Sequence, residues 1–189
     1  MNHPPSAVWK PSGAEVLAAQ NRFVPDLIGP GLKVLFCGTN PGLYSAAIGH
    51  HFGRPGNRFW PAIYAGGFTD RLYSPFEDED FLELGYGLSN IRERATGGMA
   101  ELTVAELKSG CQRLRAKVLL HRPKFLAVLS VGAYRIAFGQ PKATLGLQPL
   151  EIGPTRVWVL PSPSGLNAHY QPRALAERFR EFRAAVDAP

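Results

Sequence analysis

The chain has 189 residues, of which 45% are hydrophobic and 19% charged, and its formal net charge is +6. This composition excludes global disorder, and the length predicts one domain over residues 1–189, with residues 1–30 as a flanking segment. No apolar run approaches the ~20 residues that span a bilayer, and the first residues lack a signal-peptide core, so we expect a cytoplasmic protein without a membrane partner. The basic excess suits a polyanionic partner, because lysine and arginine release counterions from phosphates.

Cysteine and histidine spacings argue against a metal site. Cys37 and Cys111 are far apart and form no CxxC pair, so zinc, iron–sulfur and disulfide frameworks lack support. The adjacent residues His50 and His51 do not have the four-residue spacing of two ligands on one helix face. We therefore predict no metal, with both thiols buried as small hydrophobic groups.

Apolar and amphipathic segments alternate along the chain. Residues 14–23 have a modest helical pattern, and three apolar runs predict central strands, at 33–37, 125–131 and 156–160. This order predicts an α/β fold, with a mostly parallel sheet between two helix layers in a three-layer α/β/α arrangement.

Two longer helices are predicted in the second half. In residues 103–123, Thr103 and Glu106 have capping-box spacing, and Pro123 ends the pattern. Residues 172–186 repeat the amphipathic pattern, and their arginines are interpreted as a solvated helix face.

Two polar loops follow predicted strands, GTNPG at 38–42 and LPSPSGLNAHY at 160–170. In a parallel sheet, ligands bind beyond the carboxyl ends of the strands, so both loops are candidate sites. GTNPG is neither a Walker loop nor a dinucleotide loop. By spacing alone it is most simply a tight turn, while the alternative is that Pro41 stiffens the turn and gives Asn40 a fixed direction.

Aromatic and basic residues alternate in the segment 43–60. Rings beside cations suit a site that stacks a base and neutralises a phosphate. Phe59 and Trp60 continue into a helical apolar pattern and are predicted to lie in the core. Phe52, in a glycine-rich loop, is the stacking candidate.

The loop SPSGLNAHY, residues 162–170, places Leu166 among polar residues and glycine. An apolar residue there is poorly placed for a core, but it suits a wedge between DNA base steps. Ser164 can also be interpreted as a hydrolase nucleophile, although SPSGL is not the GxSxG motif.

Taken together, these blocks resemble the mismatch-specific uracil-DNA and thymine-DNA glycosylases, a branch of the uracil-DNA glycosylase superfamily. The matching blocks are GTNPGLYSA at 38–46, NRFW at 57–60, AGGFTDR at 65–71, GLSNIRER at 87–94 and VWVLPSPSGL at 157–166. The resemblance implies a monofunctional DNA repair enzyme of uracil-DNA glycosylase-like fold, without a cofactor or lyase activity. Its substrate would be uracil, with thymine or damaged pyrimidines as further bases, mispaired in double-stranded DNA and flipped out of the helix. A monomer in a bacterial cytoplasm or nucleoid would suffice.

The resemblance also assigns site residues. Asn40 falls on the asparagine that positions water, and Phe52 falls on the ring that stacks the flipped base. Gly38, Thr39 and Ser45 would line the pyrimidine pocket. The remaining assignments are contacts to DNA, by Arg58, Ser164, Gly165, Leu166, Asn167 and His169. Three positions differ from the usual pattern of the family. Thr39 stands where an apolar residue is usual, and Ser162 stands where asparagine is frequent. His169 lies close to the place of a frequent arginine.

An amide such as Asn40 only orients water, so a carboxylate helper is of interest. Glu93, between Arg92 and Arg94 in a polar segment, is the candidate, and a surface ion pair with those two arginines is the alternative. Three other functions stay open: a broader uracil-DNA glycosylase that accepts single strands, a damaged-DNA binding module without turnover, and a flavodoxin-like nucleotide binder.

Overall fold

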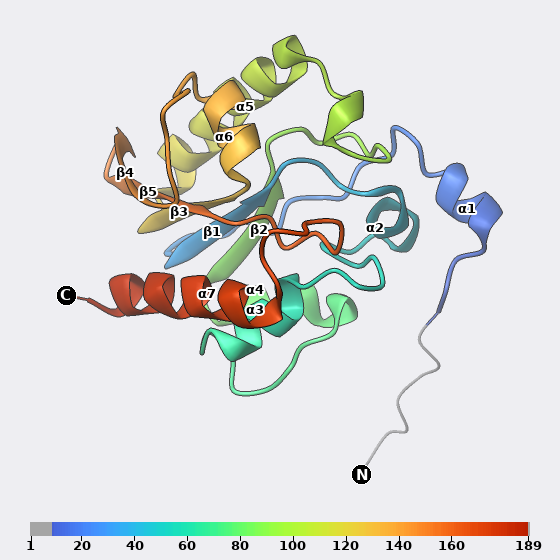
Figure 1. Cartoon of the computed structure of the whole chain (residues 1–189), viewed down its shortest axis with the longest axis horizontal. Coiled ribbons are helices and arrows are strands. Elements are labelled where there is room, and N and C mark those ends of the chain that lie inside the picture. Colours follow the sequence, from blue (N-terminus) through green and yellow to red (C-terminus); the bar gives the residue numbers. More distant parts are fainter. Residues whose placement is uncertain (1–8, 189) are drawn as a thin grey trace.

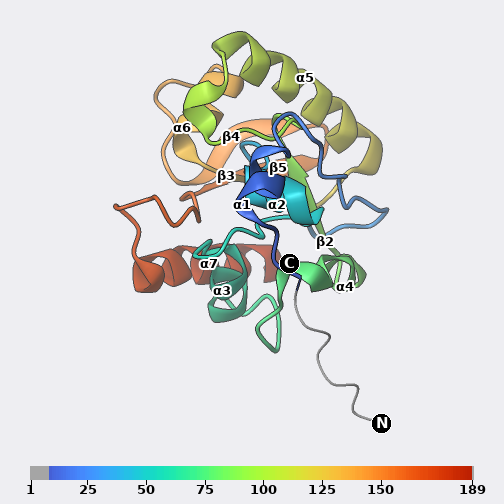
Figure 2. The same cartoon turned by 90° about the vertical axis from the view of Figure 1, so that its right-hand side faces the viewer.

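A five-stranded sheet forms the centre of the computed structural model, which describes residues 9–188. The strand order is β2-β1-β3-β5-β4, with only β4 antiparallel to its neighbour. Figures 1 and 2 show helices on both faces of this sheet, which confirms the predicted three-layer arrangement. The strands are β1 (Val34–Gly38), β2 (Tyr86–Asn90), β3 (Phe125–Leu129), β4 (Gly146–Ile152) and β5 (Thr155–Leu160).

The three predicted strands, now β1, β3 and β5, are the inner strands of the sheet, where both faces are covered. The second predicted strand, 125–131, was two residues too long, because the side chain of Ser130 caps the next helix. Strand β2 was not predicted. Its sequence YGLSN is buried at every position, yet glycine and polar residues conceal it from a search for apolar runs.

The helices divide between the two faces. On one face, α3 (Phe59–Ala65), α4 (Asp78–Glu83) and α7 (Pro172–Asp187) enclose an aromatic core, into which Phe36 of β1 projects. On the other face, α5 (Val104–His121) and α6 (Val131–Ala137) enclose an aliphatic core around Leu35 and Cys37. Alternate side chains of β1 thus supply both cores. The short helices are α1 (Gly13–Leu17), α2 (Leu43–Ile48), η1 (Pro75–Glu77) and η2 (Met99–Glu101).

Helix α5 begins as its sequence predicted. The Thr103 hydroxyl accepts a hydrogen bond from the Glu106 backbone, and the Glu106 carboxylate accepts one from the Thr103 backbone. The N-terminal helix is shorter than the pattern over 14–23 predicted. It ends at Leu17, and Asn21 has a φ of 63°, a left-handed conformation that a helix cannot continue through.

The parallel strands end at the same edge of the sheet. The connections that follow β1, β3 and β5 therefore gather there, as Figure 1 shows. Within residues 9–188, no helix combines the length and apolar character needed to cross a bilayer.

Candidate active site

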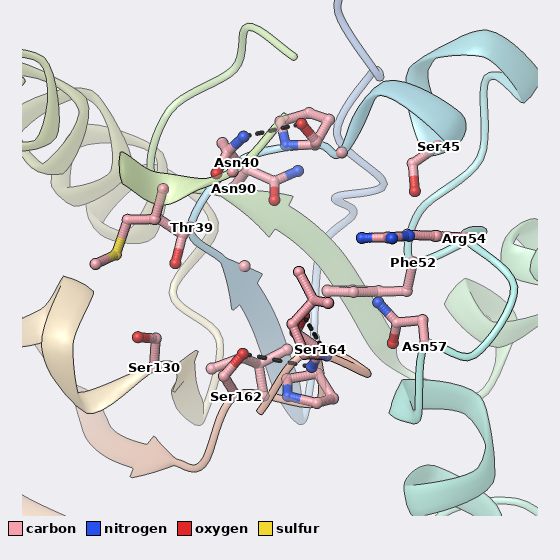
Figure 3. Close-up of a pocket in the computed structure, with 18 of the residues that line it drawn as sticks. Thr39, Asn40, Ser45, Phe52, Arg54, Asn57, Asn90, Ser130, Ser162 and Ser164 are labelled. Atoms are coloured by element: carbon pink, nitrogen blue, oxygen red, sulfur yellow. Dashed lines mark hydrogen bonds between the residues drawn. The ribbon is translucent and has the colours of Figure 1, made fainter. Parts of the chain in front are cut away.

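A cavity of about 380 Å³ opens at the carboxyl edge of the sheet. It is enclosed by the loop after β1, the segment after α2, the last residue of β2, the 96–99 turn and the loop after β5. Figure 3 shows polar side chains from these separate segments arranged around one space. The structure thus brings together the two loops that the sequence singled out.

Asn40 is held in one orientation by its neighbours. Its Nδ2 group donates to the carbonyl of Pro41 at 2.9 Å and to the Thr96 hydroxyl at 2.8 Å. The Thr96 hydroxyl must accept this bond, because it donates its own hydrogen to the Gly98 carbonyl at 2.8 Å. Both amide hydrogens are therefore used. The Asn40 oxygen remains as the acceptor available to a water molecule.

Phe52 forms an aromatic wall of the cavity. Its ring stacks on Phe59, with the centroids 4.0 Å apart and the planes at 23°. Its backbone has a φ of 54°, which is unusual for a bulky residue and turns the ring toward the sheet. A Cβ at Gly38 would lie 3.3 Å from the Phe52 ring and 2.5 Å from the Asn90 oxygen. Glycine at position 38 is therefore what leaves room for both side chains.

Asn90, at the end of β2, is a site residue that the sequence analysis did not identify. It is buried, lines the cavity and lies opposite Gly38 in the parallel pairing of β1 and β2. Figure 3 shows its oxygen directed into the cavity. Its Nδ2 group lies 3.5 Å from Nδ1 of His51, a buried histidine that also lines the cavity. The rule that led to GTNPG applies equally to Asn90, but only once β2 is recognised as a strand.

The other predicted pocket residues, Thr39 and Ser45, both line the cavity. The backbone carbonyl of Thr39 accepts from Arg92 at 2.9 Å, which continues the β1–β2 pairing beyond the strands. Ser45 is buried in α2, and its hydroxyl accepts from the Gly53 backbone at 2.9 Å. That bond ties the segment bearing Phe52 to α2, and the Ser45 hydroxyl hydrogen is still available as a donor.

Arg58 lies beneath the loop after β5. Its guanidinium donates to the carbonyls of Tyr170 at 2.5 Å, Ser164 at 2.6 Å and Asn167 at 2.8 Å. Its backbone nitrogen also donates to Pro163 at 2.9 Å. Arg58 was predicted to contact DNA, and in the structure its bonds hold the loop in shape.

The loop itself folds back on its own polar groups. Asn167 donates to the Ser162 carbonyl at 2.9 Å and accepts from the His169 backbone at 3.1 Å. A Cβ at Gly165 would lie 2.6 Å from the Gly56 carbonyl, so this position needs glycine for close packing. The result is a compact turn that presents Leu166, whose residue surface is 73% exposed, at its tip.

Among the loop residues predicted to contact DNA, Ser164, Leu166 and Asn167 line the cavity, whereas Gly165 and His169 are exposed outside it. Arg54, one of the basic residues of the predicted aromatic and basic segment 43–60, is an exposed arginine that lines the cavity. In Figure 3 it extends from the same side as Phe52.

Glu93 is not among the residues that line the cavity. Its carboxylate accepts from Lys117 at 2.7 Å and lies 3.8 Å from Arg113. Lys117 also contacts Asp26, which in turn accepts from the Ser89 hydroxyl at 2.8 Å. The hydrogen bond from Lys117 holds the pKa of Glu93 below its usual range. Glu93 is therefore in an ion pair, but its partners differ from the predicted ones, because Arg92 and Arg94 both pair with Glu106 instead.

Within residues 9–188, no group of three or more His, Cys, Asp or Glu side chains is arranged to hold a metal ion. Both cysteines are free and buried, as predicted, and burial raises the pKa of Cys111 to about 11.

Residues 25–187 match the family model described as the uracil DNA glycosylase superfamily. The fold is similar to the solution structure of a protein from Methanosarcina acetivorans that is provisionally named a uracil DNA glycosylase. The two chains are 20% identical with a TM-score of 0.53, and the match covers 86% of this chain and 98% of that one.

Proposed function

Because the chain belongs to the uracil DNA glycosylase superfamily, we propose that it hydrolyses the N-glycosidic bond of uracil in DNA. We further propose that it acts, as a monomer, on uracil or thymine mispaired with guanine in double strands. The observation that carries the proposal is the convergence of Asn40, Phe52 and Asn90 on one cavity.

The cavity suits a pyrimidine that has left the base stack. Such a base needs an aromatic face to replace its lost stacking partners, and Phe52 offers one. It also needs hydrogen-bonding partners for its edge. The Asn90 oxygen, directed into the cavity, matches the N3–H donor of uracil. Extrusion costs a few kcal/mol and is easiest at a mismatch, which supports a preference for mispaired bases.

Asn40 supports hydrolysis by water. With both amide hydrogens engaged, its oxygen accepts a hydrogen bond from a water molecule and directs the water's lone pair toward C1′ of the flipped nucleotide. The water oxygen bonds to C1′ as the C1′–N1 bond breaks. The electron pair of the C1′–N1 bond passes to the base, and the water molecule releases a proton. Donors near the base oxygens lower the barrier by stabilising the charge that develops there.

The cavity-lining residues within 9–188 include no lysine, so the described site offers no amine for a Schiff base with the sugar. This supports a monofunctional glycosylase that leaves the abasic strand intact.

The exposed loop supports a role in opening the duplex. Leu166 lies at the tip of a turn that is held in shape by hydrogen bonds from Arg58. An apolar wedge that fills the space of an extruded base needs this exposure and this support. Arg54, exposed at the cavity, is suited to bind a phosphate beside the flipped nucleotide.

The decisive experiment measures single-turnover cleavage, after alkali treatment, of duplexes carrying U:G, T:G or U:A and of single-stranded uracil DNA. We expect U:G to be the best substrate, and Asn40→Ala to lose about 10²-fold or more in rate. Equal activity on single strands would contradict mismatch specificity and favour the broader uracil-DNA glycosylase. Binding without cleavage of any substrate would contradict the enzyme and favour a damaged-DNA binding module.

A further inference from the structure

Building on the proposed function, we propose that His51 is a positioning residue that fixes the orientation of the Asn90 amide and thereby makes the cavity select uracil over cytosine.

The position of the hydrogen on His51 follows from its contacts. The side chain is buried, and its Nε2 lies 2.8 Å from the carbonyl oxygen of Pro25. A carbonyl only accepts hydrogen bonds, so Nε2 carries the hydrogen. In a neutral imidazole the other nitrogen, Nδ1, then presents a lone pair.

That lone pair determines how Asn90 points. The Nδ2 group of Asn90 lies 3.5 Å from Nδ1 of His51, and only this end of the amide has hydrogens to donate. Turning the amide by 180° would set two lone pairs against each other. The Asn90 oxygen is therefore left on the side of Gly38, facing the cavity.

The surroundings of His51 favour the neutral ring on which this arrangement depends. Burial lowers the pKa of His51, while Asp78, Asp26 and the Pro25 carbonyl act in the opposite direction. The Asp78 carboxylate is already engaged, since it accepts from Nδ1 of His50 at 2.9 Å and from the backbone nitrogen of His51 at 3.2 Å. It makes no bond to the His51 ring.

The fixed amide distinguishes two bases of nearly the same shape. Uracil has a hydrogen on N3 and donates it to the Asn90 oxygen. Cytosine has a lone pair at N3, which that oxygen repels, and an amino group where uracil has an acceptor. Cytosine would pair with Asn90 only if the amide turned, and His51 opposes the turn. A site that leaves buried polar groups unpaired rejects the wrong ligand strongly.

The test uses His51→Gln, with His50→Gln as the matched control. A glutamine at position 51 can still donate to the Pro25 carbonyl but has no counterpart of the Nδ1 acceptor. His50 is adjacent and pairs with Asp78, and it makes no contact with Asn90. The probes are duplexes with a non-cleavable 2′-fluoroarabino uridine or cytidine opposite a tetrahydrofuran residue, so that neither base is paired. The measured quantity is the ratio of the two dissociation constants.

We expect the wild type to bind the uridine duplex more tightly than the cytidine duplex. His51→Gln should reduce this preference by about fivefold to tenfold, which is the effect of losing one net hydrogen bond. His50→Gln should keep the wild-type ratio. An unchanged ratio in folded His51→Gln would overturn the inference. So would ¹⁵N NMR of the wild type showing the neutral ring of His51 protonated at Nδ1, a readout that needs no activity. Failure of the wild type to cleave natural uracil DNA would instead count against the proposed function.

Discussion

The hydroxyl of Thr96 accepts a hydrogen bond from the Asn40 amide and donates one to the Gly98 carbonyl, so the direction of both hydrogen bonds is fixed. Thr96 is fully buried and lies 56 positions from Asn40 in the sequence. The orientation of the proposed water-binding oxygen therefore depends on a hydroxyl group from a distant segment of the chain.

Replacing Thr96 with valine should slow excision. The change keeps the shape but leaves the Asn40 amide and the Gly98 carbonyl without this partner, at a cost of about 1–3 kcal/mol in the free energy of unfolding. We expect the single-turnover rate on U:G duplexes to fall about tenfold, because one net hydrogen bond that orients Asn40 is lost. Thr96→Ser should retain most of the rate, since it restores the hydroxyl. Equal rates for the valine and serine variants would contradict this role.

Leu166→Ala should weaken base extrusion without affecting stability. Because the side chain is largely exposed, the free energy of unfolding should change by less than about 0.5 kcal/mol. The rate should fall more for U:A than for U:G, since a well-paired base is harder to extrude. Leu120→Ala is the control, because Leu120 is 76% exposed on α5, outside the cavity lining. A similar loss in both variants would exclude a specific wedge.

The two arginines near the cavity should differ in their salt dependence. Arg54→Gln should reduce the slope of log affinity against log salt by about one, the effect of losing one phosphate contact. Arg58→Gln should weaken binding by loosening the loop while keeping the slope, because the guanidinium of Arg58 donates to three carbonyls of the loop.

Arg122→Gln removes the same charge before β3, at the opposite edge of the sheet from the cavity, and serves as the control for Arg54. An unchanged slope in Arg54→Gln, measured by fluorescence anisotropy over a salt series, would show that Arg54 does not bind phosphate.

Glu93→Gln should affect stability and leave excision unchanged. The pKa of Glu93 is lowered mainly by Lys117, so the carboxylate stabilises the fold above the usual glutamate pKa. This contribution is lost as pH falls through the lowered pKa. Because the pair is partly exposed, we expect less than about 1 kcal/mol at pH 7, measured by urea unfolding. A rate loss of about 10²-fold would restore Glu93 as a catalytic base.

His51 should make the fold less stable in mild acid. Its pKa is lowered in the folded state, chiefly by burial, so the unfolded chain takes up a proton first as pH falls below about 6.5. The free energy of unfolding should therefore decline between that pH and the folded-state pKa of His51. In His51→Gln this part of the decline, followed by urea unfolding at several pH values, should disappear. If the free energy of unfolding declined as much in His51→Gln as in the wild type, the decline would belong to other titrating groups.

Local sequence located the loops that line this cavity, although the role expected of Asn40 came from the family resemblance. Asn40 and Phe52 stand in short loops whose glycines and proline mark them as turns, and Leu166 stands out as an apolar residue in a polar loop. The inner strands were equally clear, because strands buried on both faces need continuous apolar runs.

Only the tertiary structure revealed the partners that orient these residues. Thr96, His51 and Asn90 were not assigned to the site from the sequence, and Arg58 was assigned a contact to DNA but not its bonds to the loop. Each acts on a residue or carbonyl at least 39 positions away. Glu93 shows the converse, since its local sequence suggested chemistry and Lys117 on α5 holds it in an ion pair. The direction of a side chain is fixed by hydrogen bonds between distant segments, which meet only when parallel strands bring their carboxyl ends to one edge.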